Sequence, residues 1–377
     1  MSASSDSYWL ALKRVRGVGP RTAKLLIDAF GGPERIFAAG ERAISEAGVP
    51  RHVARAITEF RDFEPLEKEL CEMTRIGARL VRITDADYPV NLRHIADPPP
   101  FLYARGDAPI ADAKCVAVVG ARAASDAGRR MAQRLGLELA AKGVVVVSGL
   151  ARGIDAEAHQ GALDAKGRTF AVLGSGIDII YPAEHRDLAQ KIIESAGALL
   201  SELPIGTPPV GENFPTRNRI LSGMCLGVVV VEAAEKSGSL ITARMALEQD
   251  RQVFAVPGSP LSGKTRGSNR LLKEGAVLVE CVEDVVEELA PQLAGLTDHA
   301  PLTETVVGGP ASARTVESED RVDALAILEQ LNQEERLHVD SIIETTGLPT
   351  SNVLRLLLEL ELKGLVSQHP GKLFSRA

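Results

Sequence analysis

The chain has 377 residues, of which 45% are hydrophobic and 25% are charged, so length and composition allow two or three domains with large cores. No run of about 18 apolar residues is present, so no membrane-spanning helix is expected. The four cysteines lie far apart with no C-x-x-C pair, so neither a disulfide framework nor a cysteine zinc site is indicated. The net charge of −7 argues weakly against nucleic acid as a partner, because domains that bind it often present a basic face.

The first residues, MSASSDSYWLALKRVRGVGP, turn basic early and lack the apolar run of a secretory signal. Together with the scattered cysteines, this favours a reducing cytoplasm as the location. Local charge matters more than the total, and from Tyr8 to Phe30 five basic residues accompany the single acid Asp28. We therefore expect a cytoplasmic protein whose basic side chains gather in particular segments.

Residues 1–75 predict a small helical domain. Apolar residues recur at helical spacing in TAKLLIDAF, and the glycines of GVGP interrupt the pattern before Pro20 restarts a helix at its first turn. The result is a helix, a glycine-rich hairpin and a helix. This basic segment could offer amides and cations to a phosphate, or it could be a protein-interaction module.

Residues 76–290 predict a Rossmann-like α/β domain with a doubly wound parallel sheet. Continuous apolar runs, as in strands covered on both faces, alternate with amphipathic segments. The expected strands are 115–120, 144–148, 170–174, 226–232 and 253–257. The expected helices are 126–142, 155–166, 185–195 and 239–250.

Residues 291–319 predict a linker, because they mix Pro, Gly, Ser and Thr without sustained periodicity. Residues 320–377 predict a winged helix, with three helix candidates and a two-strand wing around Pro370 and Gly371. The third helix candidate balances Arg355 and Lys363 against two glutamates, so it suits protein docking at least as well as DNA reading.

Five glycine-rich loops follow the expected strands, at the edge of the sheet where such folds bind ligands. Together they would present backbone N–H groups suited to phosphate. The candidate binding residues in these loops are Gly120, Arg122, Gly149, Arg152, Gly153, Gly174, Gly176, Ser237, Ser239, Gly258 and Asn269. For the two arginines the alternative is local pairing with carboxylates, and for Ser239 it is capping of the next helix.

A nucleotide cofactor is not expected at these loops. Arg122 and Ala124 stand where the G-x-G-x-x-G fingerprint needs glycine, Ser148 ends the second strand in place of an acidic ribose reader, and no Walker motif occurs. Asp155, Glu157 and His159 are expected to cap and pack, because no nucleophile or metal partner stands at matching spacing. We therefore expect no catalytic residue, no metal and no cofactor.

The segment NFPTRNRILSG at 213–223 is the strongest candidate for gripping an anionic partner. Phe214 offers a ring for stacking, and Arg217 and Arg219 offer planar forks for phosphate. If the segment is extended, both arginines point to one side of Asn218 and act together. The alternative is that Phe214 lies in the core and that one arginine pairs with Glu202 or Glu232.

In order along the chain, VVGARAAS, SGLARGIDAEAH, LGSGIDIIYPAEH, SELPIGTPPVGENFPTRNRILSG, VVVEAAEKSGSLITARMALEQDRQVFAVPG and GSNRLLKEGA closely resemble the DNA-processing protein A (DprA, or Smf) family. The resemblance covers residues 79–290 and extends more loosely to both ends. There the family commonly has a helical domain of sterile-alpha-motif or helix-hairpin-helix type and a C-terminal winged helix.

The resemblance implies a non-enzymatic protein that binds single-stranded DNA, forms a homodimer through its Rossmann-like domain and loads the RecA recombinase onto incoming DNA during natural transformation. The family's pocket arginine falls on Arg122, with Ala121 in place of the usual Ser or Thr. The family's F-P-x-R-N-R segment falls on Phe214, Pro215, Arg217, Asn218 and Arg219.

Two other functions remain open on the residues alone. A nucleotide phosphoribohydrolase-like enzyme would use a related Rossmann scaffold, but VPGSPLSGKTRGSN lacks the glutamate of that enzyme motif. A transcription regulator would read duplex DNA with the winged helix and sense a nucleotide with the Rossmann-like domain.

Overall fold

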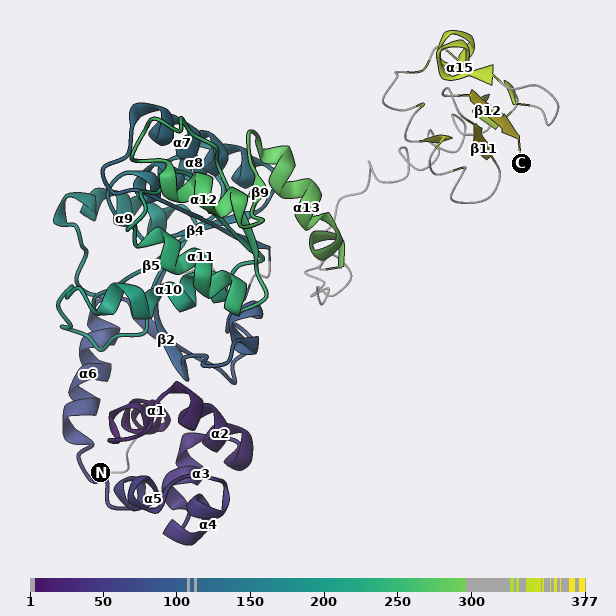
Figure 1. Cartoon of the computed structure of the whole chain (residues 1–377). Coiled ribbons are helices and arrows are strands. Elements are labelled where there is room, and N and C mark those ends of the chain that lie inside the picture. The colour runs from purple at the N-terminus through teal and green to yellow at the C-terminus, as the bar shows by residue number, and fades with distance from the viewer. Residues whose placement is uncertain are drawn as a thin grey trace. The chain divides into compact units, whose positions relative to one another are not determined.

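The computed structural model describes residues 4–106, 109–111 and 114–295, and in the C-terminal part 326–328, 330–331, 337–346, 348, 353, 356–357, 360, 366–369 and 373–376. The chain divides into two compact units, Met1–Ala300 and Pro301–Ala377, and each is described by itself (Figure 1). Within the described residues, no helix combines the length and the apolarity that crossing a membrane requires.

The N-terminal region is helical, as predicted. Its helices are α1 (Ser5–Arg14), α2 (Pro20–Phe30), α3 (Pro33–Ala38), α4 (Glu41–Glu46), α5 (Arg51–Thr58) and α6 (Glu64–Arg75). The Ser4 side chain caps α1 by accepting from the Ser7 amide, and Pro20 starts α2 at its first turn. Between them Gly17 has a φ of +91°, and a Cβ there would lie 2.8 Å from Val53 Cγ2, so the tight turn requires glycine.

The described strands of the first unit form one nine-stranded sheet in the order β1-β2-β6-β5-β4-β3-β7-β8-β9. The strands are β1 (Ala78–Arg82), β2 (Phe101–Arg105), β3 (Cys115–Val119), β4 (Val145–Ser148), β5 (Thr169–Val172), β6 (Ala198–Ser201), β7 (Gly227–Val230), β8 (Gln252–Ala255) and β9 (Val277–Leu278). From β6 to β9 every neighbouring pair is parallel, whereas β1 and β2 add antiparallel pairs at one edge. The predicted parallel sheet is therefore confirmed, with two antiparallel strands that the sequence analysis did not anticipate.

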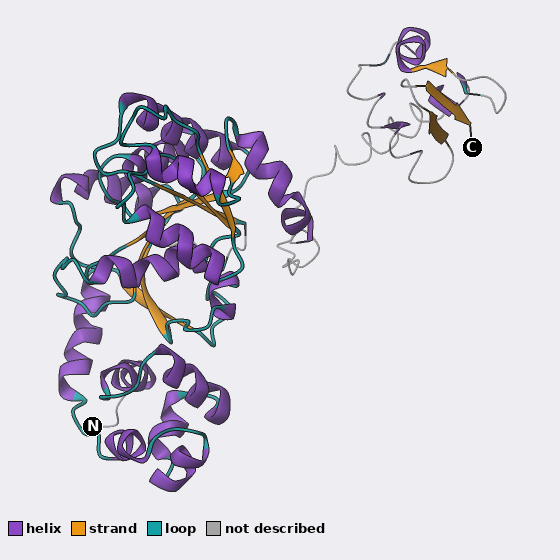
Figure 2. Cartoon of the chain, viewed as in Figure 1, coloured by secondary structure: helices purple, strands orange, loops and turns teal. Residues whose placement is uncertain are grey.

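Helices cover both faces of the sheet (Figure 2). They are α7 (Asp126–Ala141), α8 (Ile154–Asp164), α9 (Arg186–Glu194), α10 (Asn213–Gly223), α11 (Ser239–Glu248), α12 (Arg266–Lys273) and α13 (Val282–Gly295). Alternate residues of β3 face two different cores: Val116 and Val118 pack with α7 and α8, whereas Cys115, Ala117 and Val119 belong to the core that includes α10 and α11. This burial on both sides explains why the strand sequences are continuously apolar.

The second unit contains a small three-stranded sheet in the order β10-β12-β11. Its described elements are β10 (Leu337–His338), α15 (Val339–Thr346), β11 (Val366–His369) and β12 (Leu373–Arg376). The antiparallel β11–β12 pair is the predicted wing, so the winged-helix prediction is confirmed. Arg355 and Lys363 lie outside the described residues, as do positions 296–319 of the predicted linker, whereas residues 291–295 belong to α13.

Candidate nucleic-acid interface

A cavity of about 570 Å³ lies where the strand order reverses, between β3 and β7. In doubly wound sheets the loops on either side of this switch point diverge and leave room for a ligand. The volume falls within the usual range of ligand pockets. The loops after β3, β4 and β7 and the first turns of α10 line the cavity. Seven of the predicted residues contribute to this lining: Gly120, Arg122, Phe214, Arg217, Asn218, Ser237 and Ser239.

Phe214 faces this cavity, so its alternative placement in the core is wrong. The side chain is half-buried, and a Cβ on Gly174 would lie 2.7 Å from its ring, so the ring rests against that glycine. The guanidinium carbon of Arg122 lies 5.1 Å from the centre of the ring. Arg122 is exposed and forms no ion pair with any described residue, which leaves its charge available to a ligand.

Arg217 supplies a buried cation at the cavity wall. Its guanidinium donates to the Val172 carbonyl oxygen, and Nε donates to Asn218 Oδ1 at 3.2 Å. Burial lowers the pKa of Arg217 to about 10, so the group stays charged at neutral pH. A Cβ on Gly149 would lie 2.4 Å from Arg217 Nη1, so this glycine leaves space for the guanidinium.

Asp155 also lines the cavity, but its carboxylate is occupied. Oδ2 accepts from the Gly149 amide at 3.1 Å and from the Ala151 amide at 3.4 Å, which holds the loop before α8. Burial raises the pKa of Asp155, while the nearby Arg217 charge opposes that shift. His159 is buried, with Nδ1 2.7 Å from Thr169 Oγ1, and burial lowers its pKa to about 3. His159 therefore packs as predicted, whereas the capping role predicted for Asp155 is wrong: Gly153 is the N-cap residue of α8, and the Asp155 carboxylate binds the preceding loop.

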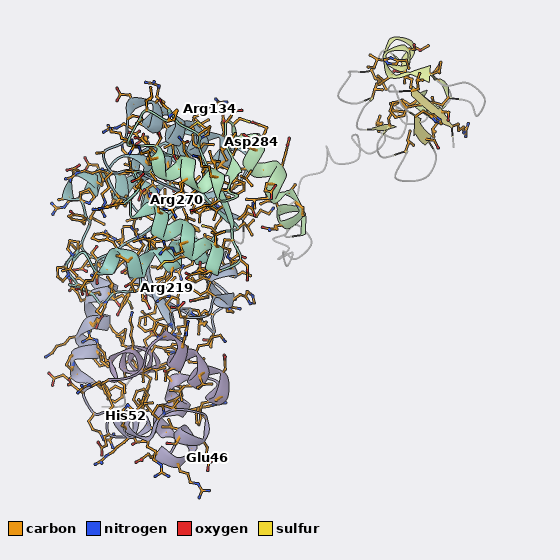
Figure 3. The ribbon with its side chains drawn as sticks, in the orientation of Figure 1. Glu46, His52, Arg134, Arg219, Arg270 and Asp284 are labelled. Carbon is orange, nitrogen blue, oxygen red and sulfur yellow. The ribbon has the colours of Figure 1, made fainter. Side chains whose placement is uncertain are left out.

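Arg219 lies outside the cavity, and two expectations about it are wrong. Residues 213–223 form helix α10, not an extended segment, so two side chains two residues apart diverge by about 200° around the helix axis. Arg219 (labelled in Figure 3) is 7% exposed. Its Nη2 lies 2.5 Å from Glu202 Oε2, and its Nη1 donates to the Asp97 carbonyl oxygen at 2.7 Å. The alternative pairing with Glu202 is confirmed, and Arg219 cannot act together with Arg217.

Arg152 and the remaining glycines shape the surroundings. Arg152 pairs with Glu184 through bonds of 2.7 and 2.8 Å, the local pairing that was its alternative, and borders a smaller cavity of about 60 Å³ beside Phe214. Gly153 and Gly176 lie in adjacent loops, outside the lining of the larger cavity. The Asn269 side chain brackets Gly258, accepting from its amide at 3.0 Å and donating to its carbonyl at 2.8 Å. These two residues stabilise a loop and do not line the large cavity.

The N-terminus of α7 is occupied by the chain's own carboxylate. Glu232 is 2% exposed, and its Oε2 accepts from the Ser125 amide at 3.0 Å and from the Ser125 hydroxyl at 2.8 Å. In dinucleotide-binding folds the pyrophosphate takes this position at the first helix. The structure therefore agrees with the missing glycine fingerprint, because an internal anion fills the place of a cofactor phosphate.

Ser237 and Ser239 place two hydroxyls at the start of α11, with the two oxygens 2.7 Å apart. Gly238 is the N-cap residue and Ser239 is already helical, so the alternative role of Ser239 as the cap of this helix is wrong. Tyr181 was not among the predicted residues, but it lines both cavities, and its ring centre lies 5.9 Å from that of Phe214. It stands in LGSGIDIIYPAEH, where an aromatic residue in a glycine-rich ligand loop was the available signal.

Comparison with known proteins identifies the family to which this chain belongs. The sequence model described as "DNA recombination-mediator protein A" matches residues 79–290, and the one described as "DprA winged helix domain" matches residues 310–372. The chain belongs to the DprA/Smf family. Protein Smf of Escherichia coli is 41% identical over 309 residues, which cover 81% of this chain and 79% of that protein.

Solved DprA structures support the same assignment. The X-ray structure of DprA from Streptococcus pneumoniae matches with a TM-score of 0.63 and 32% identity, covering 76% of this chain and 99% of that one. A DprA structure from Helicobacter pylori, described as giving insight into its single-stranded DNA binding mode, matches with a TM-score of 0.52 and 28% identity, covering 58% and 98%. Membership in the DprA family places the chain among DNA-processing proteins, and the predicted roles of its individual site residues stay predictions.

Proposed function

We propose that this protein binds single-stranded DNA in the cavity between β3 and β7, protects it, and loads a RecA-type recombinase onto it during natural transformation. The observation that carries the proposal is the convergence of Arg122, Phe214 and Arg217 on one cavity. A ring and two cations suit a flexible strand, because bases stack on the ring while the cations attract phosphates.

The acidic overall charge is compatible with this role. Arg122 is exposed and Arg217 remains charged although buried, whereas Asp155 is neutralised in part by two backbone amides. The cavity is therefore locally electropositive in a chain of net charge −7.

We further propose that the protein acts without covalent chemistry, as a homodimer formed through its Rossmann-like domain, in the cytoplasm. The exposed apolar residues Ile241 and Leu247 on α11 support a docking surface on that domain.

The test is binding of the full chain to an oligothymidine, followed by fluorescence anisotropy at several salt concentrations. The logarithm of the affinity should fall with the logarithm of salt by about 0.7 per phosphate contact. Arg122→Ala should weaken binding and reduce that slope. Arg134→Ala is the matched control, because Arg134 is an exposed arginine of α7 (Figure 3) that pairs with Glu138 at 2.7 Å and does not line the cavity.

The proposed site would be overturned if Arg122→Ala left the affinity for the oligothymidine unchanged, or if the protein bound duplex DNA with equal affinity. The loading step has a separate test: the host recombinase should assemble faster on strands coated with single-strand-binding protein when this protein is added. No acceleration would refute loading and leave DNA binding standing.

A further inference from the structure

Tyr181 is an exposed aromatic residue beside the proposed DNA site. It is 41% exposed, and its ring centre lies 5.9 Å from that of Phe214 with the two ring planes tilted by 46°. Its hydroxyl has no hydrogen-bond partner among the residues that the structure describes. A large ring left open to solvent at the rim of a cavity has surface available for a ligand.

Two other tyrosines differ from Tyr181 both in burial and in the hydrogen bonding of their hydroxyls. Tyr88 and Tyr103 are fully buried, and their hydroxyls donate to the Pro99 carbonyl at 2.8 Å and to Glu69 Oε1 at 2.6 Å. Those rings pack the core and satisfy their polar atoms, as buried tyrosines normally do. Tyr181 has neither feature, so packing does not account for it.

The position of Tyr181 joins the two cavities. It lines the large cavity together with Phe214 and Arg122, and it lines the 60 Å³ cavity together with the same two residues and Arg152. The Arg152–Glu184 pair bridges from the loop after β4 to η2 (Ala183–His185), directly beyond Tyr181. The segment carrying the tyrosine is thus tied to the neighbouring loop at the cavity rim.

We infer that Tyr181 and Phe214 form a stepped platform that stacks two successive bases of a single strand, with Arg122 at the phosphates beside them. This inference rests on the proposed function and adds a binding residue to it. The two ring planes are tilted by 46°, with their centres 5.9 Å apart. Two bases that each lie parallel to one of these rings cannot be parallel to each other, as successive bases of a regular duplex are. A flexible single strand can adopt this arrangement and a duplex cannot.

The chemistry predicts tolerance of sequence. Every base has a π-face, so stacking on a ring discriminates little between bases. An abasic position, by contrast, removes the stacking partner and keeps the phosphate. The platform thus recognises the presence of consecutive unpaired bases.

The experiment measures binding of the full chain to an oligothymidine of about 16 nucleotides, the upper end of common single-strand site sizes. Tyr181→Ala should weaken binding by about 5- to 150-fold, the range expected for one lost base stack. The salt slope should stay unchanged, because no phosphate contact is lost. Tyr181→Phe keeps the ring and should restore the affinity, while Tyr181→Leu keeps apolar bulk without the ring and should not.

A spectroscopic readout tests the stacking itself. 2-Aminopurine fluoresces more weakly when it stacks, so an oligothymidine with a single 2-aminopurine should show quenching on binding that Tyr181→Ala reduces and that Tyr181→Ala with Phe214→Ala abolishes. Equal losses for Tyr181→Phe and Tyr181→Ala would assign the effect to the hydroxyl and overturn the platform.

Failure of this inference is distinct from failure of the proposed function. If Tyr181→Ala binds as the wild type does while Arg122→Ala binds weakly, the platform is refuted and the DNA site stands. If the wild type does not bind single-stranded DNA at all, the proposed function falls first.

Discussion

The guanidinium carbon of Arg122 lies 5.1 Å from the centre of the Phe214 ring, so a residue from the loop after β3 and one from the start of α10 meet over the same cavity. The two residues are far apart in the sequence. The fold brings the two together at the switch point of the sheet. The contact with the ring orients the guanidinium, which is carried on a long and flexible side chain.

This contact predicts non-additive effects on binding. Arg122→Ala and Phe214→Ala should each weaken binding to single-stranded DNA, and the double variant should lose less than the sum of the two losses, because each residue positions the other. The coupling should be about 0.5–1 kcal/mol, typical of an exposed cation–π pair. Anisotropy titrations of the four proteins measure it, and strictly additive losses would show that the pair does not cooperate.

Gly149→Ala is predicted to weaken DNA binding although it removes no charge. The new Cβ would lie 2.4 Å from Arg217 Nη1, so the guanidinium must leave its bond to the Val172 carbonyl. Loss of a hydrogen bond to a charged group costs about 1.5–3 kcal/mol of stability, which urea unfolding would detect. The control must be a glycine where a new Cβ meets no atom, the backbone is not left-handed and the cavity is not lined. Gly143 fails because its φ is +78°, and Gly238 fails because it lines the cavity.

Gly211→Ala has neither clash nor positive φ, and Gly263→Ala likewise meets open space. Of the two, Gly263 lies outside the cavity lining and serves as the control. Unchanged stability and affinity in Gly149→Ala would show that Arg217 can occupy another position at no cost.

Arg219→Met is predicted to destabilise the protein while leaving the salt slope of DNA binding unchanged. The Arg219 and Glu202 side chains are 8% and 10% exposed, and removing Arg219 takes away the ion-pair partner of a buried carboxylate, which keeps only the nearby Lys13 charge. Such changes typically cost about 3–5 kcal/mol, measurable by urea unfolding. A reduced salt slope in the folded variant would instead place Arg219 at the phosphates.

Lys13 predicts a pH dependence of stability. Burial lowers the pKa of its ammonium to about 8, although the Glu202 carboxylate opposes the shift. Because the unfolded chain holds this proton up to about pH 10.5, it binds more protons than the folded chain between pH 8 and 10.5, and this group makes stability rise with pH in that window. The penalty is fully present below pH 8 and amounts to about 3 kcal/mol.

Lys13→Met is the reference for that measurement, since other groups also titrate at alkaline pH. The difference in unfolding free energy between wild type and Lys13→Met should change by about 3 kcal/mol from pH 8 to 10.5. A constant difference would mean that the ammonium is well solvated in the folded protein.

The sequence predicts the sheet better than it predicts the site. Strands such as β3 and β7 are buried on both faces and lie in the long apolar runs CVAVV and LGVVVV, which identify them. The apolar run of β6 is only ALL, between Gly197 and Ser201, and gives little signal. Helix α10 was missed because its polar residues Arg217, Asn218 and Arg219 are buried together with its apolar ones, so the sequence does not show an apolar face opposite a polar face. The roles of Arg217 and Arg219 could therefore not be separated, because only the helical twist sends one to the cavity and the other to Glu202.

Arg217 and Arg219 point to different sides of α10, and this also determines whether the protein or the DNA strand changes conformation on binding. Two residues after Arg217, Arg219 is fixed to Glu202 and Asp97, and the ammonium of Lys13 in α1 donates to the Glu202 carbonyl. The helix cannot rotate toward a ligand without breaking a buried ion pair, so the cavity wall is preorganised. The conformational entropy lost on complex formation is then mainly that of the DNA strand. A single strand already extended by tension should therefore bind more tightly than a relaxed strand.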